Sequence, residues 1–180
     1  MKPLTTYKDA IKKSIQFLSE DPKTVFIGYG IKYGSKGGGF FSDIDENQLI
    51  ETPVAEGLML SMAIGLALEG YKPVVFYERF DFIMNSMDAL VNHLNAMELL
   101  SKGEFAPKVI IRCVVGGKKA PFFTGPVHTQ DFTESIRGLV DFPVLKPKTV
   151  EEMVTAYQDA YHSPSSSIIV EEKDWYAKTQ

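Results

Sequence analysis

The chain has 180 residues, of which 44% are hydrophobic and 23% charged, as is typical of a soluble globular domain with a sizeable core. Its formal net charge is −4 and it contains no basic block, which argues against nucleic acid and anionic membranes as partners. No apolar run reaches the roughly 18 residues that a membrane-spanning helix requires.

The first half of the chain alternates helical and strand-like segments. An amphipathic helix begins at Thr5 or Thr6, which can cap it, and ends at Asp21-Pro22. A second helix, Val54 to Leu68, is rich in small residues and has Gly70 as its C-cap. Buried strands are predicted over residues 24–28, 48–51 and 72–77.

The second half continues the alternation. A long helix is predicted from Asp81 to Ser101, and the most hydrophobic strand from Lys108 to Val115. After a long loop come a helix, a strand, a helix and a strand, over residues 131–138, 143–145, 150–161 and 167–171. Apolar strands that alternate with helices predict an α/β domain with three layers, in which helices flank a mainly parallel sheet of about six strands. No repeat or linker interrupts it, so residues 1–180 are expected to form one domain.

The single cysteine, Cys113, lies in an apolar strand-like run and is interpreted as core filler, not as a nucleophile. One thiol excludes a disulfide framework, which fits a reducing cytoplasm. The three histidines show no metal-ligand spacing, so no metal site is predicted within the chain. His93 and His162 lie within helices and are interpreted as structural.

Ligands of a parallel sheet bind in the loops at the carboxyl ends of its strands. Glu56 lies just after such a loop, at the start of an otherwise apolar helix. A first-turn glutamate usually faces water and is favoured there by the helix dipole. The nearby Gly57, Ser61 and Gly65 instead predict close packing, which would partly desolvate Glu56 and raise its affinity for protons. Such a carboxyl group suits proton exchange with a bound heterocycle.

Three further features lie in loops. His128 follows a strand and precedes a helix, a position that makes a role in a site plausible. The simpler interpretation is a loop histidine that is hydrogen-bonded to a neighbouring carbonyl group.

Phe80 and Phe82 flank Asp81. Both phenylalanines could belong to the core, or one could present its face to a planar ligand. The glycine-rich segment 28–39 fits neither the dinucleotide nor the P-loop spacing, so it is predicted to be a mobile surface loop instead of a phosphate cradle.

A set of segments, none specific alone, carries a family resemblance in its order along the chain. They are 51–57 (ETPVAEG), 63–75, 80–82 (FDF), 87–93, 128–132 (HTQDF), 138–139, 144–149, 163–164 and 168–171. Together they resemble the transketolase-like pyrimidine-binding domain. The closest version is the β subunit of the decarboxylating component of 2-oxo acid dehydrogenases, for pyruvate or branched-chain substrates.

The resemblance implies a thiamine-diphosphate-binding fold, with thiamine diphosphate and Mg²⁺ as cofactors. Glu56 matches the glutamate that hydrogen-bonds a ring nitrogen of the cofactor's aminopyrimidine. Phe82 matches the aromatic residue that stacks on this ring, and His128 the histidine that faces substrate and the acyl-accepting group. Asn85 lies near a position that is often polar in the family. The reactive carbon of thiamine must lose a proton to the cofactor's own imino group, and the glutamate stabilises that imino form.

The sequence departs from the family pattern in two ways. Ala55 stands where a serine often precedes the glutamate, which removes a hydroxyl group near the cofactor. The dehydrogenase β subunit continues into a second domain, whereas this sequence stops at Gln180, which favours a split transketolase-like, decarboxylase or carboligase enzyme.

The sequence also has no Gly-Asp-Gly motif, which in such enzymes helps to hold the metal and the phosphates. A partner of the α type is therefore expected to carry the diphosphate-binding half, in a heterotetramer or larger assembly acting on a 2-oxo acid or a ketose. The cofactor would lie across the interface. Methionines of the two central helices are candidates for that interface, or for the core.

Two alternatives remain open. The chain could be a catalytically silent structural or regulatory module that kept the fold and pairs with a partner. A silent module has no physical reason to hold Glu56, Phe82 and His128 together, which argues against this alternative. The chain could also be a truncated β subunit of a 2-oxo acid dehydrogenase, which the length of the intact gene product would decide.

Overall fold

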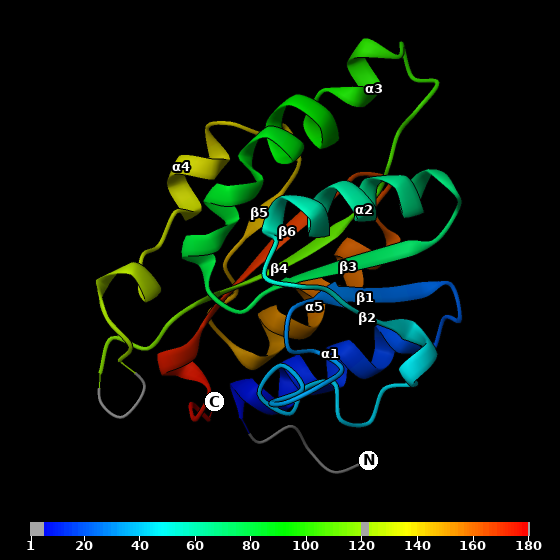
Figure 1. Cartoon of the computed structure of the whole chain (residues 1–180). Helices are drawn as coiled ribbons and strands as arrows, with labels where there is room; N and C mark the ends of the chain where they lie inside the picture. The colour runs from blue at the N-terminus through cyan, green and yellow to red at the C-terminus, as the bar shows by residue number, and fades with distance from the viewer. Residues whose placement is uncertain (1–5, 120–122, 180) are drawn as a thin grey trace.

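The computed structural model describes residues 6–119 and 123–179, which form one α/β domain around a single sheet (Figure 1). The sheet has six strands in the order β2-β1-β3-β4-β6-β5, and every neighbouring pair is parallel. Its strands are β1 (Thr24–Gly28), β2 (Leu49–Glu51), β3 (Lys72–Tyr77), β4 (Ile110–Val115), β5 (Val144–Leu145) and β6 (Ser167–Glu172). The predicted architecture is confirmed, and the sheet is parallel throughout.

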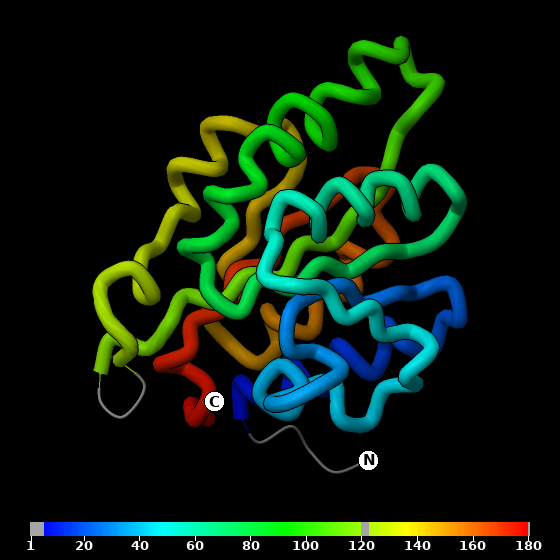
Figure 2. Tube along the Cα trace, viewed as in Figure 1, coloured from blue at the N-terminus to red at the C-terminus, as the bar shows by residue number. Residues whose placement is uncertain are grey.

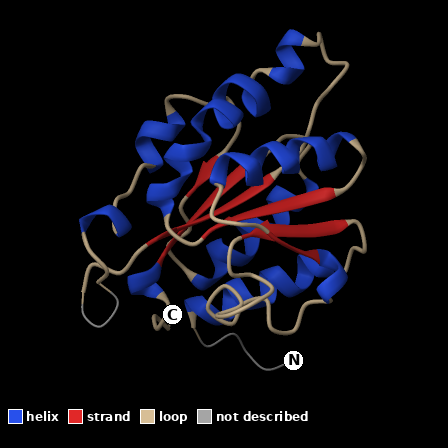
Figure 3. Ribbon diagram, viewed as in Figure 1, coloured by secondary structure: helices blue, strands red, loops and turns tan. Residues whose placement is uncertain are grey.

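Helices cover both faces of the sheet, which gives the three layers (Figure 3). α1 (Tyr7–Ser19) and α5 (Val150–His162) pack together on one face. α2 (Glu56–Leu68) lies on the other face with two irregular helices, η2 (Phe80–Ser86) and η3 (Asp88–Asn95). The shorter helices are η1 (Glu46–Gln48), α3 (Met97–Leu100), η4 (Pro126–His128), α4 (Thr133–Arg137) and η5 (Lys173–Trp175).

The alternation of side chains along each strand builds two separate cores. In β3, Val75 and Tyr77 pack under α2, while Val74 and Phe76 pack against the α1 and α5 side. Cys113 of β4 is fully buried in the α2 core, and burial raises the pKa of its thiol, so the interpretation as core filler is confirmed. Among the described residues, no helix combines the length and apolar character needed to cross a membrane.

A threonine caps the N-terminus of α1 and another caps the N-terminus of α5. The Thr6 hydroxyl accepts a hydrogen bond from the Asp9 N–H at 3.1 Å, and the Thr149 hydroxyl accepts one from the Glu152 N–H at 3.1 Å. At the end of α2, Gly70 has a φ of +83°, the conformation that terminates helices most readily when the residue is glycine. The predicted cap of α1 at Thr6 is therefore confirmed, as is the predicted end of α2 at Leu68. The predicted start of α2 at Val54 is wrong, because the helix begins at Glu56.

The prediction of one continuous helix from Asp81 to Ser101 is wrong. The segment is a 3₁₀ helix (η2), then a π-helix (η3), then the single α-helical turn of α3, which projects from the domain (Figure 1). The first junction falls at Met87, directly after Asn85 and Ser86, whose short polar side chains are poor helix formers because they bond to other groups. Ser86 does so here, since the Tyr77 hydroxyl donates to its Oγ at 2.7 Å.

The glycine-rich segment after β1 is a surface loop, as predicted, with Tyr29 and Tyr33 exposed. The Glu51 carboxylate accepts the backbone N–H groups of Gly30 at 2.6 Å and Lys32 at 2.7 Å. The loop curls beside the N-terminal helix (Figure 2). Three apolar side chains in or next to it are buried in the core beside α1, namely Ile31, Phe40 and Phe41. These contacts link residues far apart in the sequence, so glycine content alone could not predict them.

The small residues of α2 are only partly explained by close packing. A methyl group on Gly57 would lie 3.2 Å from the Asn85 carbonyl oxygen, so this position is tight. Ser61 and Gly65 instead face outward, and a methyl group on Gly65 would meet no atom within 4 Å. The predicted tight packing of the helix is therefore wrong at these two positions.

Gly65→Ala is expected to raise the free energy of unfolding of the isolated chain by about 0.5–1 kcal/mol, because alanine loses less backbone entropy in a helix. Urea denaturation followed by circular dichroism measures this change. A loss of stability would show that the outer face of α2 is covered within the chain itself.

Candidate functional site

A cavity of about 400 Å³ opens at the carboxyl edge of the sheet, beside the ends of β1 and β3. The chain passes from β1 to β2 on one side and then to β3 on the other, so this is the point where the strand order reverses. Its lining is mainly apolar, from Val54, Met59, Phe76 and Phe82. The polar groups that line it include Glu56, Arg79, Thr124 and His128.

Glu56 is the first residue of α2 and is half-buried at the cavity wall. The Asn85 side-chain amide donates to its Oε2 at 3.3 Å, and the helix N-terminus favours its negative charge. Beneath it, the Tyr77 hydroxyl lies 3.4 Å from the Glu56 carbonyl oxygen. Burial raises the pKa of Tyr77, so its hydroxyl stays protonated and donates to Ser86. The Asn85 amide orients the carboxylate, which still lines the cavity.

Phe82 and His128 also line the cavity, and their two rings are in contact. Their rings meet edge to face, with centroids 5.4 Å apart and planes at 86°. Among the described residues, the buried Nδ1 of His128 has no hydrogen-bond partner. Phe80, the neighbouring aromatic residue, is instead fully buried in the α2 core. One of the two flanking phenylalanines is therefore core, and the other lines the cavity.

Asp81, between these phenylalanines, ties the loop of His128 to η2. Its Oδ1 accepts hydrogen bonds from the Gln130 side chain at 2.9 Å and from the Gln130 backbone N–H at 3.3 Å. Sequence reasoning noted Asp81 only as a neighbour of aromatic residues. Its partner lies 49 positions away, so no local pattern could reveal this contact.

Gly116, directly after β4, allows the His128 backbone to approach. A methyl group added to Gly116 would lie only 1.9 Å from the His128 carbonyl oxygen. A glycine that follows an apolar strand is the only sequence feature that could have indicated this contact, because such glycines often permit close backbone approach.

Gly116→Ala is expected to displace the His128 backbone and lower the free energy of unfolding by about 1–3 kcal/mol, because the added methyl group cannot fit beside the His128 carbonyl oxygen. Urea denaturation followed by circular dichroism measures this change. Gly138→Ala is the matched control, since its methyl group would meet only ordinary contacts from 3.5 Å. Equal stabilities of the two variants would contradict the close approach of His128 to Gly116.

The structure thus brings the predicted residues Glu56, Phe82 and His128 to one cavity, with Asn85 bonded to Glu56. Their chemical roles remain predictions. His93 lies elsewhere, exposed and 3.3 Å from Asp88, and His162 packs beside Phe17 and Tyr161. In the described part of the chain, no cluster of three or more His, Cys, Asp or Glu side chains could hold a metal ion.

Comparison with known proteins gives the family. The profile described as transketolase, pyrimidine binding domain matches residues 5–178. The chain belongs to this family.

The β subunit of the mitochondrial pyruvate dehydrogenase E1 component from Saccharomyces cerevisiae is 26% identical over 141 residues, which cover 78% of this chain and 38% of the yeast protein. The 2-oxoisovalerate dehydrogenase β subunit from Bacillus subtilis is 26% identical over 118 residues, or 62% of this chain and 36% of that protein. The chain spans about half the length, or less, of the curated relatives it matches.

Among solved structures, one described as a split gene transketolase, inactive beta4 tetramer, superposes with a TM-score of 0.72 at 18% identity. The match covers 95% of this chain and 52% of that one. It supports the fold.

Proposed function

We propose that this chain supplies the pyrimidine-binding half of a thiamine-diphosphate enzyme whose diphosphate-binding half belongs to another subunit. The observation that carries the proposal is one apolar cavity lined by the Glu56 carboxylate and by the Phe82–His128 pair. The family membership supports the choice of cofactor.

The residues present fit an aminopyrimidine ring. A flat heterocycle needs an apolar slot, an aromatic face and a group that can share a proton with a ring nitrogen. Phe82 would supply the face and Glu56 the proton-sharing carboxylate, which Asn85 already orients at 3.3 Å. When bound, thiamine diphosphate would supply the electron sink for breaking or forming a carbon–carbon bond next to a carbonyl group.

The residues of the chain would then act by binding, orientation and proton placement. Glu56 would hold a proton at the ring nitrogen and so fix the tautomer of the pyrimidine. His128 would give a proton to, or take one from, the substrate oxygen. The apolar walls exclude water and strengthen both interactions.

The surface beside the cavity supports a partner subunit. Val54 lines the cavity and is 65% exposed, and Leu58, in the first turn of the adjoining α2, is also exposed. Exposed apolar side chains beside a site favour coverage by another protein surface. The partner would be of the α type and would hold the diphosphate and Mg²⁺, in a heterotetramer or larger assembly. The donor would be a 2-oxo acid or a ketose.

Calorimetric titration of thiamine diphosphate with Mg²⁺ tests this proposal, first into the chain alone and then into the chain co-purified with its partner. We expect no measurable binding to the chain alone and tight binding to the complex. Weak binding to the complex of Glu56→Ala would assign the contact to the cavity. Absence of binding in every case would support a catalytically silent module instead.

A further inference from the structure

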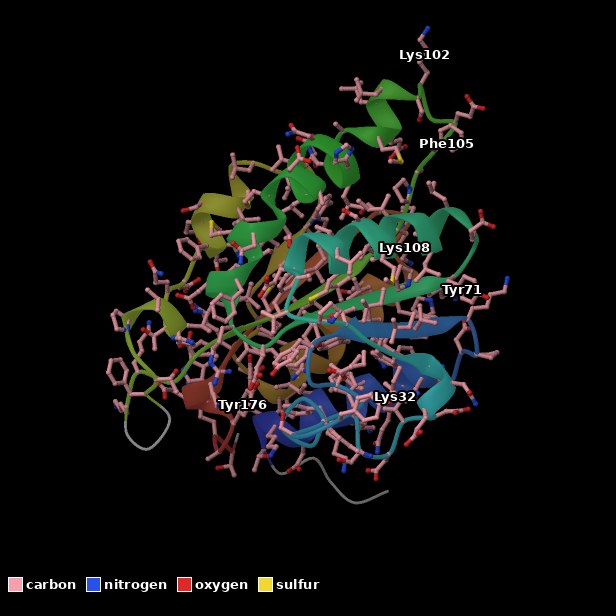
Figure 4. The ribbon with its side chains drawn as sticks, viewed as in Figure 1. Lys32, Tyr71, Lys102, Phe105, Lys108 and Tyr176 are labelled. Carbon is pink, nitrogen blue, oxygen red and sulfur yellow. The ribbon has the colours of Figure 1, made fainter. Side chains whose placement is uncertain are left out.

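A small cavity of about 40 Å³ lies at the amino edge of the sheet, opposite the edge that carries the candidate site. Its walls come from the starts of β1 and β3, the segment that leads into β4, and the end of α5. Tyr71 and Lys108 both line it, and Figure 4 shows them together on one side of the molecule, with Tyr176 on the other. We refer to it as the amino-edge cavity.

Two lysine side chains line the amino-edge cavity, and both contact Tyr161. The Lys72 ammonium lies 4.1 Å from the centroid of the Tyr161 ring, and the Lys108 ammonium lies 5.9 Å from it. Lys72 also donates to the Tyr161 hydroxyl at 2.8 Å, and Lys108 donates to the Tyr161 carbonyl oxygen. The two positive charges are therefore held in place beside one aromatic side chain.

Only one of these two charges is balanced by a carboxylate. Asp21 accepts from the Lys72 ammonium at 2.7 Å and from the Tyr161 hydroxyl at 2.9 Å. The hydrogen bond from Lys72 lowers the pKa of Asp21 to about 2, so this carboxylate stays charged. Among the described residues no carboxylate pairs with Lys108, and burial together with the charge of Lys72 lowers its pKa. One positive charge therefore remains for a ligand with one negative charge.

Thr24, the first residue of β1, gives independent evidence for a ligand. It lines the same cavity and is only 1% exposed. In the part of the chain that the structure describes, its Oγ1 has no hydrogen-bond partner. Leaving a buried hydroxyl group unpaired costs free energy, so a ligand that accepts a hydrogen bond from Thr24 would stabilise the fold.

The backbone offers such a ligand little, so recognition would depend on side chains. The Thr24 N–H donates to the Asp21 carbonyl at 2.9 Å, and the Lys72 N–H donates to the Lys23 carbonyl at 2.9 Å. An ammonium group has three N–H donors, and the contacts with Tyr161 and Asp21 use only some of them. The donors that remain belong to ammonium and hydroxyl groups, which favour a negatively charged acceptor.

The size and the remaining wall of the cavity limit the ligand further. A water molecule needs roughly 10–15 Å³ of such space, so a volume of about 40 Å³ suits one small ion and excludes a phosphate ester or a nucleotide. Leu18, Val74 and Ile110 make the rest of the wall largely apolar. A second negative charge would be buried there without a partner, at a large cost in free energy.

We propose that the amino-edge cavity binds a small monovalent anion, such as chloride or formate, held by the Lys72 and Lys108 ammonium groups and the Thr24 hydroxyl. The ion would join the starts of β1 and β3 to the end of α5, and so stabilise the folded chain. This site is independent of the proposed function, because no described residue lines both cavities.

An NMR titration of the ¹⁵N-labelled chain tests binding directly. Sodium chloride or sodium formate replaces sodium gluconate at constant ionic strength, because gluconate is too large for the cavity. We expect saturable shifts of the Thr24, Lys72 and Lys108 amides, and affinity about tenfold weaker in Lys108→Met, which loses a charge-assisted hydrogen bond. Lys23→Met is the matched control, since it removes an exposed charge next to Thr24.

Saturation by either ion with this ranking would support the site, and the ion that binds more tightly would identify its occupant. Absence of saturable shifts with both ions, or equal binding by the two lysine variants, would overturn the proposal. Tighter binding of inorganic phosphate than of either monovalent ion would also overturn it.

Thr24→Val gives a second test, in which the anion should reverse the effect of the substitution. Valine keeps the shape of threonine and removes the hydroxyl group. In gluconate the variant should be at least as stable as the wild-type chain, because a buried unpaired hydroxyl is lost. In chloride or formate the midpoint of urea unfolding should rise more for the wild-type chain than for the variant. An equal rise in both proteins would show that the ion acts elsewhere and would overturn the role of Thr24.

Discussion

Glu56→Gln is expected to lower the turnover of the assembled enzyme by about 10²–10⁴-fold, the range typical of losing a group that positions or transfers a proton. Glutamine keeps the size of the side chain and can still accept a hydrogen bond from Asn85, which lies 3.3 Å from Glu56. It cannot share a proton with a ring nitrogen as a carboxylate does. The effect should therefore fall on chemistry more than on folding.

The measurement compares kcat of the variant with that of the wild-type enzyme, after circular dichroism shows that both fold. Glu69→Gln is the matched control, because Glu69 is an exposed carboxylate at the other end of α2. It should retain full activity. A Glu56→Gln enzyme with most of its activity would contradict the assignment of Glu56.

Asn85→Ala tests the orientation of the Glu56 carboxylate separately from its ability to share a proton. The substitution removes the one side-chain hydrogen bond that the structure shows to this carboxylate, and the carboxylate itself stays in place. A fall in kcat of about tenfold is expected, smaller than that for Glu56→Gln, since one neutral donor to a charged group contributes about 1.5–3 kcal/mol at most. Asn92→Ala, on the exposed side of η3, provides the control.

The sequence predicts this fold well because its strands and caps are local features. β1, the helix cap at Thr6 and the start of α5 at Val150 need only neighbouring residues, and their predicted positions are confirmed. The parallel sheet was also predictable, because apolar strands alternate with helices along the chain.

The features that the sequence does not predict depend on contacts between distant residues. Glu51 holds the glycine-rich segment through N–H groups about twenty positions earlier, and Gly116 touches the His128 carbonyl. One cavity is lined by Lys8, Arg79 and Lys173, which come from three separate parts of the chain. No spacing rule connects such residues, so only the folded chain shows that they meet.

A second large effect is expected from a buried ion pair between β4 and β6. Arg112 and Glu171 are both 0% exposed, and the guanidinium donates from Nε and Nη2 to the two carboxylate oxygens at 2.6 and 2.8 Å. The Tyr157 and Tyr176 hydroxyls donate to the same carboxylate at 2.9 and 3.0 Å. Burial opposes the charge of Arg112, but Glu171 outweighs burial and raises the pKa of Arg112 above its ordinary value.

Arg112→Met is expected to lower the free energy of unfolding by about 3–5 kcal/mol, because Glu171 would keep a buried charge without its partner. Urea denaturation measures the change, and the double variant Arg112→Met/Glu171→Gln should recover part of it by removing that charge. Lys12→Met is the control, since its pair with Asp43 is exposed and contributes less than about 1 kcal/mol. A loss for Arg112→Met as small as the control's would show that the pair is dispensable.

The same pair supports one wall of the candidate site. Phe76 lines the cavity that holds Glu56 and His128, and its ring centroid lies 4.4 Å from the Arg112 guanidinium. Loosening the pair should therefore weaken thiamine diphosphate binding to the complex along with stability. In the double variant, cofactor affinity should recover in part together with the free energy of unfolding. Recovery of one without the other would show that the pair does not shape the cavity.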